Sequence, residues 1–193
     1  KLPVTFYRST EELPEFTDYS MKGRTYRYMQ SEALYPFGYG LSYTSFKLQT
    51  AGSSNDTTAQ QINLKIKVTN TGSTAGKEVA QIYINAPNGK LGKASRTLAA
   101  FEKTKLLDPG ATQELSFTIP YYNFASYDDS GITGHKSCFV LEEGSYTVYA
   151  GTDVRSAEQI FSFDMDSLLV IKECEEAYAP VRPFDRMHAT QDG

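Results

Sequence analysis

The sequence predicts an all-β fold, in which an extended arm precedes an antiparallel β-sandwich. Three observations lead to this prediction. Residues 46–167 contain roughly seven short segments in which apolar residues recur at every second position, the period of a half-buried strand. Glycine, proline, asparagine and aspartate separate these segments and mark turns. The chain also holds 14 Tyr and 11 Phe, residue types that are common in strands.

The predicted arm consists of residues 1–45. Beyond a short opening strand this segment shows little alternation, but it is dense in tyrosine, arginine, phenylalanine and proline. Residues 11–19 have room for one short helical turn, which Pro14 limits. Residues 24–28 are expected to be extended, with cations alternating with rings. We expect the whole arm to lie against a larger body.

The sandwich is expected to begin with a strand at Phe46, followed by a polar hairpin or loop at residues 52–60. The clearest strand covers residues 62–69, where four aliphatic residues alternate with polar ones. Such a pattern buries one face and leaves the other in water. Residues 78–85 form the next strand, and they are partly apolar on both faces, which indicates an inner position in a sheet.

The second half of the sandwich follows the same pattern. Asp108, Pro109 and Gly110 form a strong turn signal, since proline presets φ and glycine accepts positive φ. Short strands at this spacing are typical of an immunoglobulin-like or fibronectin type III-like sandwich. The strands are expected at residues 97–107 (one or two strands), 115–119, 139–140, 146–150 and 160–165.

Composition excludes several classes of partner. The net charge of −4 and the lack of a basic stripe argue against nucleic acid or an anionic membrane. No apolar run is long enough to span a bilayer, so we expect a soluble protein, either cytoplasmic or secreted. Cys138 and Cys174 lack the spacing of a zinc site and are expected to be free thiols, with a disulfide as the alternative in an exported protein.

The segment from Leu34 to Thr44 is the most specific in the chain. It holds four aromatic residues, two glycines and a proline within eleven residues, which suits neither an amphipathic helix nor a strand interior. Together with residues 1–6 (KLPVTF) and 23–28 (GRTYRY), it resembles the C-terminal end of glycoside hydrolase family 3 enzymes, the β-glucosidases and β-xylosidases. The residues at positions 13–16 (LPEF) and 19–26 (YSMKGRTY) resemble the β-xylosidase-like branch more than typical β-glucosidases.

The resemblance implies a domain organisation. Residues 1–45 would be the end of an α/β sandwich domain with its aromatic linker arm, and residues 46–167 a fibronectin type III-like sandwich. Residues 168–193 begin apolar and then become charged and proline-containing, which indicates a surface strand or turn followed by a C-terminal tail or linker. Because some family members have reordered domains, the missing barrel would lie either before or after this chain.

The resemblance also implies a function. The chain would be a non-catalytic structural domain that braces the catalytic domains of a retaining β-glycosidase acting on terminal β-linked glucose or xylose. Its partners would be those missing domains, with an oligosaccharide as the substrate of the intact enzyme and with no metal or organic cofactor. In the family, the nucleophilic aspartate belongs to the barrel and the acid/base glutamate to the α/β domain. No position of this chain matches either motif, so we expect it to be inactive alone.

The residues themselves offer no competing catalytic site. A retaining glycosidase needs two carboxyl groups about 5 to 5.5 Å apart. Neighbouring carboxylates in turns or tails are expected to be solvated, because no apolar surroundings would raise their pKa. His135 and His188 have no nucleophile at an interpretable spacing. The carboxylate pairs are Glu11 with Glu12, Asp128 with Asp129, Glu142 with Glu143 and Glu175 with Glu176.

The candidate contact residues are Arg24, Tyr26, Arg27 and Tyr28. Their guanidinium groups and rings either anchor the arm between domains or border the rim of the active site. The rival function is a free-standing carbohydrate-binding or adhesion module, since a sandwich fold does not decide function. The absence of tryptophan and the presence of an aromatic arm before the sandwich weaken this alternative.

Overall fold

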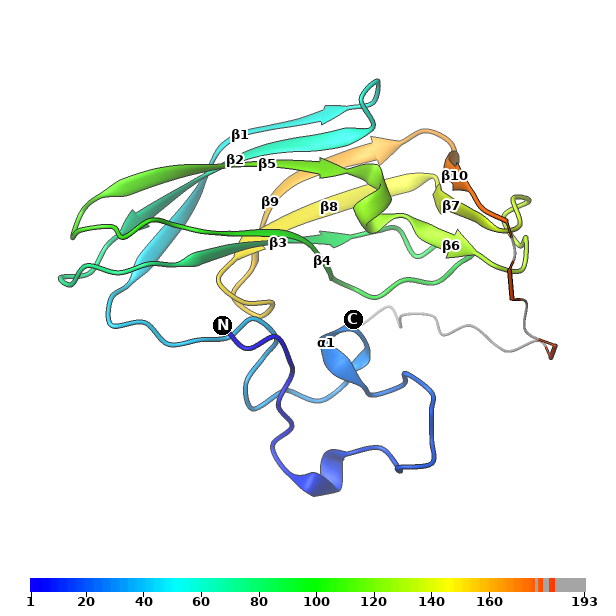
Figure 1. The fold of residues 1–193 in the computed structure, drawn as a ribbon, viewed down its shortest axis with the longest axis horizontal. Helices are drawn as coiled ribbons and strands as arrows, with labels where there is room; N and C mark the ends of the chain where they lie inside the picture. The colour runs from blue at the N-terminus through cyan, green and yellow to red at the C-terminus, as the bar shows by residue number, and fades with distance from the viewer. Residues whose placement is uncertain (176, 179–180, 183–193) are drawn as a thin grey trace.

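The computed structural model describes residues 1–175, 177–178 and 181–182. Figure 1 shows two layers of strands, with the arm on the outer side of one layer. The second part of the predicted tail, with His188, lies outside the described residues.

All strand pairs are antiparallel, which confirms the predicted all-β sandwich. The first layer has the order β1-β2-β5 and the second the order β4-β3-β8-β9. A small third sheet, β10-β7-β6, continues at one end (Figure 1). The strands are β1 (Phe46–Asp56), β2 (Gln61–Asn70), β3 (Val79–Asn85), β4 (Thr97–Lys103), β5 (Thr112–Pro120), β6 (Ser126–Asp128), β7 (Cys138–Leu141), β8 (Gly144–Gly151), β9 (Glu158–Met165) and β10 (Leu169–Glu173).

The core lies between the two layers and is built by the alternation seen in the sequence. On β2 the predicted aliphatic residues are buried, while Lys65 and Lys67 between them are exposed. Aromatic rings complete the core, with Tyr146 stacked on Phe163 at a centroid distance of 5.2 Å. The hydroxyl group of Tyr146 donates to the carbonyl oxygen of Glu142 at 2.9 Å, so this buried polar atom is satisfied.

Of the two alternatives predicted for residues 52–60, a polar hairpin or a loop, the structure has the hairpin. The strand β1 continues to Asp56, and residues 57–60 turn the chain into β2. Among the described residues, β1 is an edge strand that pairs with β2 alone, with a register shift between Thr50 and Gly52. An edge strand with one solvated face tolerates serine and asparagine, because pairing with the amphipathic β2 supplies its stability.

Two further expectations are refined. The segment 97–107, expected to hold one or two strands, holds one, β4, which ends at Lys103. The surface strand expected at the start of the tail is β10, which pairs with β7 across a register shift.

The arm is folded back on itself. Its first residues lie antiparallel to the aromatic segment, since the Gly38 amide donates to the Leu2 carbonyl at 2.8 Å and the Phe6 amide to the Tyr35 carbonyl at 3.0 Å. The helical turn expected near residue 11 is the 3₁₀ helix η1 (Thr10–Glu12).

The extended conformation expected for residues 24–28 is wrong, because Thr25–Tyr28 forms one turn of helix, α1. The aromatic stacking of Tyr26, described below, holds this turn in place, and such a tertiary contact is invisible to a local pattern.

We expect Leu64→Ala to lower the free energy of unfolding by about 2 to 5 kcal/mol, because it leaves a cavity among fully buried side chains. Urea denaturation measures this change. The neighbouring Lys65→Ala is the control. It removes only an exposed ion pair with Glu114 at 3.5 Å, so a loss of less than about 1 kcal/mol is expected. Equal losses for the two variants would contradict the proposed inward and outward faces of β2.

Candidate interdomain surface

Gln81 on β3 joins the arm to the sandwich. Its side chain is only 3% exposed. The amide nitrogen Nε2 donates to the carbonyl oxygens of Gly38 at 3.1 Å and Thr152 at 2.5 Å, and Oε1 accepts a hydrogen bond from the Tyr83 hydroxyl group at 2.6 Å. One side chain therefore connects the arm, the β8–β9 loop and the centre of the second sheet.

Gly38 is required for this contact. It has a φ of +82°, and a Cβ atom added there would lie 2.0 Å from Oε1 of Gln81. Both the backbone conformation and the space therefore favour glycine. The Tyr83 hydroxyl group is buried in the same place, and burial raises its pKa, so it stays neutral and serves as a hydrogen-bond donor.

Tyr26 is the second anchor of the arm. Its ring stacks on Phe37 at 4.4 Å and meets the edge of Tyr83 at 6.3 Å. Its hydroxyl oxygen accepts a hydrogen bond at 3.0 Å from the amide of Leu98, a residue of β4. This predicted contact residue therefore binds the arm to the sandwich of the same chain.

The other three predicted contact residues differ from one another in their surroundings. The Arg24 guanidinium group donates to the backbone carbonyls of Glu15, Asp18 and Ser20, so it shapes the outer loop of the arm. Arg27 is exposed and lies over the ring of Tyr26 at 5.8 Å. Tyr28 borders a cleft beside the β3–β4 connection.

The β8–β9 loop, residues 152–157, holds the arm from the other side. The Val154 amide donates to the Phe37 carbonyl at 3.0 Å, and the Arg155 guanidinium group donates to the Ala33 carbonyl at 2.6 Å. Arg96 supports the loop from behind, because it donates to the Val154 carbonyl at 2.6 Å and lies 4.2 Å from the ring centroid of Tyr149.

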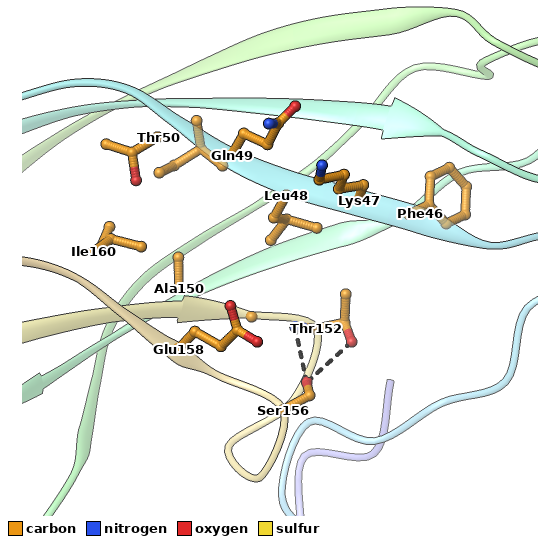
Figure 2. A pocket seen from close by; sticks show the side chains of 12 residues that line it. Phe46, Lys47, Leu48, Gln49, Thr50, Ala150, Thr152, Ser156, Glu158 and Ile160 are labelled. Atoms are coloured by element: carbon orange, nitrogen blue, oxygen red, sulfur yellow. Dashed lines mark hydrogen bonds between the residues drawn. The ribbon is translucent and has the colours of Figure 1, made fainter.

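A cavity of about 350 Å³ lies beside this loop, between the edge strands β1 and β9. Figure 2 shows Leu48, Ala150 and Ile160 along the cavity and the Ser156 hydroxyl group bonded to Thr152 at its end. The cavity is the open side of the sandwich, where neither edge strand has a second neighbour among the described residues.

The arm exposes several large apolar side chains. Four of them stand out, since Phe16, Tyr19, Leu41 and Tyr43 are 91%, 88%, 89% and 99% exposed. Such a concentration of exposed apolar residues in one segment of the chain is typical of a surface that another part of a protein covers. The arm also carries Val4, Phe6, Leu13, Met21, Leu34 and Tyr35 as exposed hydrophobic residues.

The prediction that the carboxylate pairs are solvated is wrong at Asp128, which is fully buried. Its oxygens accept hydrogen bonds from the Gly131 amide at 2.7 Å and from the Thr133 amide and hydroxyl group at 2.8 and 2.6 Å. Burial alone would raise the pKa of Asp128, but the hydrogen bonds from Thr133 and its neighbours lower it. The carboxylate closes the loop that leads into β7.

The same prediction is wrong at Glu142, which is also buried. Its oxygens accept hydrogen bonds from the Lys90 amide at 2.7 Å and from the Lys93 ammonium group at 2.8 Å. Burial would raise the pKa of Glu142, yet the charge and hydrogen bond of Lys93, with the amides of the loop, lower it. Glu142 therefore fixes the β3–β4 connection, whereas a catalytic acid needs a raised pKa.

The two cysteines both lie in the described part of the chain. Cys138 and Cys174 are free, as predicted. Burial raises the pKa of the Cys138 thiol, which makes it unreactive.

The described residues include no group of three His, Cys, Asp or Glu side chains that could hold a metal ion. Nor do they include a helix with the length and apolarity needed to cross a bilayer.

We expect Gln81→Ala to release the arm, because it leaves the Tyr83 hydroxyl group and the Gly38 carbonyl without this partner. The expected loss is about 2 to 4 kcal/mol of unfolding free energy, with faster limited proteolysis within residues 8–22. Gln49→Ala, at an exposed position on β1, is the matched control. If both variants were cleaved at the wild-type rate, Gln81 would not be the anchor.

The lowered pKa of Glu142 gives a pH dependence of stability. Its contribution is fully present above its ordinary pKa of 4.5 and is lost as the pH falls through the lower folded value. Glu142→Gln should therefore lose about 2 kcal/mol at neutral pH and show a shallower decline of the urea midpoint in acid. The exposed neighbour variant Glu143→Gln should decline as steeply as the wild type. A wild-type acid profile in Glu142→Gln would refute this assignment.

Comparison with known proteins matches residues 78–154 to the family model of a fibronectin type III-like domain. A β-glucosidase of Ruminococcus albus is 51% identical over 172 residues, which are 87% of this chain and 18% of that protein. A xylan 1,4-β-xylosidase of Xylanibacter ruminicola is 48% identical over 53% of this chain and 12% of its own length.

Solved structures give the same result. The chain superposes on a β-glucosidase from Paenibacillus barengoltzii with a TM-score of 0.88 and 39% identity, over 98% of this chain and 23% of that one. The chain thus spans about a fifth of the length of the relatives that it matches. Both β-glucosidases and β-xylosidases are among them.

Proposed function

Because the chain belongs to glycoside hydrolase family 3, in the region with the fibronectin type III-like domain, we propose that it braces the catalytic domains of a β-glycosidase. The enzyme would act by retention on terminal β-linked glucose or xylose, as the names of the relatives suggest for these two sugars. This chain would contribute no catalytic carboxylate to that reaction. The missing domains of the same enzyme would be its partner.

The observation that carries the proposal is an arm that is fixed to the sandwich and yet exposes large apolar side chains. Gln81 and Tyr26 hold it on the sandwich, while Phe16, Leu41 and Tyr43 are exposed. An arm that is held so firmly and yet leaves large rings in water suits a surface that a neighbouring domain covers. Interfaces between domains of one chain usually bury about 600 to 1,500 Å².

The buried carboxylates support a non-catalytic role. Asp128 and Glu142 both have lowered pKa values and are engaged by hydrogen bonds from loops. A general acid needs a raised pKa and access to substrate. These two groups have neither property, so they serve structure rather than proton transfer.

The rival proposal, a free-standing carbohydrate-binding or adhesion module, has less support. The relatives are several times longer than this chain, and the exposed arm would have no partner in a module that worked alone.

The bracing role predicts that one double variant changes the stability of the intact enzyme but not that of the isolated chain. The double variant Leu41→Ser with Tyr43→Ser should leave the melting temperature of the 193-residue chain unchanged, because both side chains are exposed there. In the intact enzyme that contains the chain it should lower the unfolding free energy by about 3 kcal/mol, since two covered apolar side chains are lost. Differential scanning calorimetry measures both values.

Ile132→Ser serves as the control, since this residue is exposed but belongs to the loop before β7 rather than to the arm. It should change neither protein. If the double variant were as stable as the wild type in the intact enzyme, the arm would not be the covered surface.

A further inference from the structure

A cleft of about 240 Å³ lies between the arm and the sandwich. It is formed by α1, the β3–β4 connection with the start of β4, and the segment from η2 (Tyr121–Phe124) into β6. We call it the α1–η2 cleft. Each of these segments contributes polar side chains to the lining, and they are Arg27, Tyr28, Lys93, Thr97, Asn123 and Ser126.

The α1–η2 cleft carries one positive charge that its own lining does not balance. Two cations line it, Arg27 and Lys93, and the lining holds no Asp or Glu among the described residues. The Lys93 ammonium group pairs with the buried Glu142 carboxylate at 2.8 Å, so these two charges compensate each other. No carboxylate of the described part of the chain forms an ion pair with Arg27. The charge of Arg27 is therefore left over.

Hydrogen-bond donors of the cleft are weakly engaged. The Arg27 guanidinium group makes a long hydrogen bond of 3.5 Å to the Tyr26 hydroxyl oxygen and lies 5.8 Å from the centre of that ring. A guanidinium group has five N–H donors, so most of them can face a ligand or water. Asn123 is exposed, and its Nδ2 has a similarly long contact of 3.4 Å with the Ala99 carbonyl. A negatively charged acceptor can thus find a charged and a neutral donor on two walls of the cleft.

Each wall of the cleft is held by a separate contact. Tyr26 fixes α1 through its ring stack and its hydrogen bond to β4. Glu142 fixes the β3–β4 connection through the Lys90 amide and the Lys93 ammonium group. The buried rings of Tyr121 and Phe124 hold η2. The cleft is therefore formed before any ligand arrives, which lowers the cost of binding.

These properties favour a carboxylate as the ligand. An ionised carboxylate only accepts hydrogen bonds and a guanidinium group only donates them, and two parallel bonds of a guanidinium fork match the two carboxylate oxygens. A hydrogen bond between ionised partners is about twice as strong as one between neutral groups. A neutral ligand would leave the charge of Arg27 unbalanced. A phosphate dianion would bring a second charge, for which Lys93 is already engaged by Glu142.

We propose that the α1–η2 cleft binds one carboxylate group, which in the intact enzyme belongs to an Asp or Glu side chain of the missing domains. The second half rests on the proposed function, because bracing brings another domain against the arm. One exposed guanidinium group holds a free carboxylate weakly. A side chain presented by its own domain has a high effective concentration and loses less freedom on binding, so it fills the same site far more completely.

The first test is a titration of the 193-residue chain with sodium propionate, followed by amide NMR shifts. Propionamide, which has nearly the same shape and no charge, is titrated separately, and sodium chloride keeps the ionic strength constant. We expect propionate to give saturable shifts at residues of the cleft, with a dissociation constant on the order of 10 mM. Propionamide should bind at least about tenfold more weakly.

Arg27→Gln should weaken propionate binding about tenfold, since it removes the charge and the fork. Lys47→Gln is the matched control. It also removes one positive charge from an exposed position, but in the separate cavity beside β1, so it should bind propionate like the wild type. Thermal melts verify that each variant is folded. The site is refuted if propionamide binds as tightly as propionate, or if Arg27→Gln binds propionate like the wild type.

The second test compares melting temperatures in the intact enzyme. Arg27→Gln should lower the melting temperature there by roughly 3 °C and leave that of the isolated chain unchanged. Arg27→Lys keeps the charge but loses the fork, so it should lie between the wild type and Arg27→Gln. If Arg27→Gln left the intact enzyme unchanged, the assignment to a neighbouring domain would be wrong, even with propionate bound by the chain. Bracing is tested by Leu41 and Tyr43 instead, so one idea can fail without the other.

Discussion

The buried amide of Gln81 is the interaction on which the arrangement of arm and sandwich depends. It joins Gly38 of the arm, Thr152 of the β8–β9 loop and Tyr83 of the second sheet at one point. A buried amide costs free energy unless its donors and acceptor are paired, so these segments are held in one arrangement. The place of the segment around Gly38 on the sandwich follows from these bonds.

Two buried carboxylates hold loops in place through hydrogen bonds, as Gln81 holds the arm. Glu142 orders the β3–β4 connection, and Asp128 orders the loop before β7. In each case several amides converge on a charge that water cannot reach, which makes the bonds strong and their loss costly. The sandwich can thus carry long connections in defined shapes.

Much of the fold was predictable, because alternation along a strand is a local signal. The clearest case is β2, where the aliphatic residues expected inside the core are buried. The sequence left open whether residues 52–60 form a hairpin or a loop, since the serines and asparagines of β1 become a strand only by pairing with β2. The sequence held one signal for Gln81, because it is a polar residue within an apolar strand. No sequence signal near Glu142 predicts that it is buried while its neighbour Glu143 is exposed.

The sequence alone determined the sandwich and the family, because hydrophobic period and the motif from Leu34 to Thr44 are properties of neighbouring residues. Only the tertiary structure decided which polar groups are buried and what the arm touches. Tyr26 meets Tyr83, and Gly38 meets Gln81, across more than forty residues. Such contacts depend on how the layers pack, and no local pattern of charge or hydrophobicity encodes that distance.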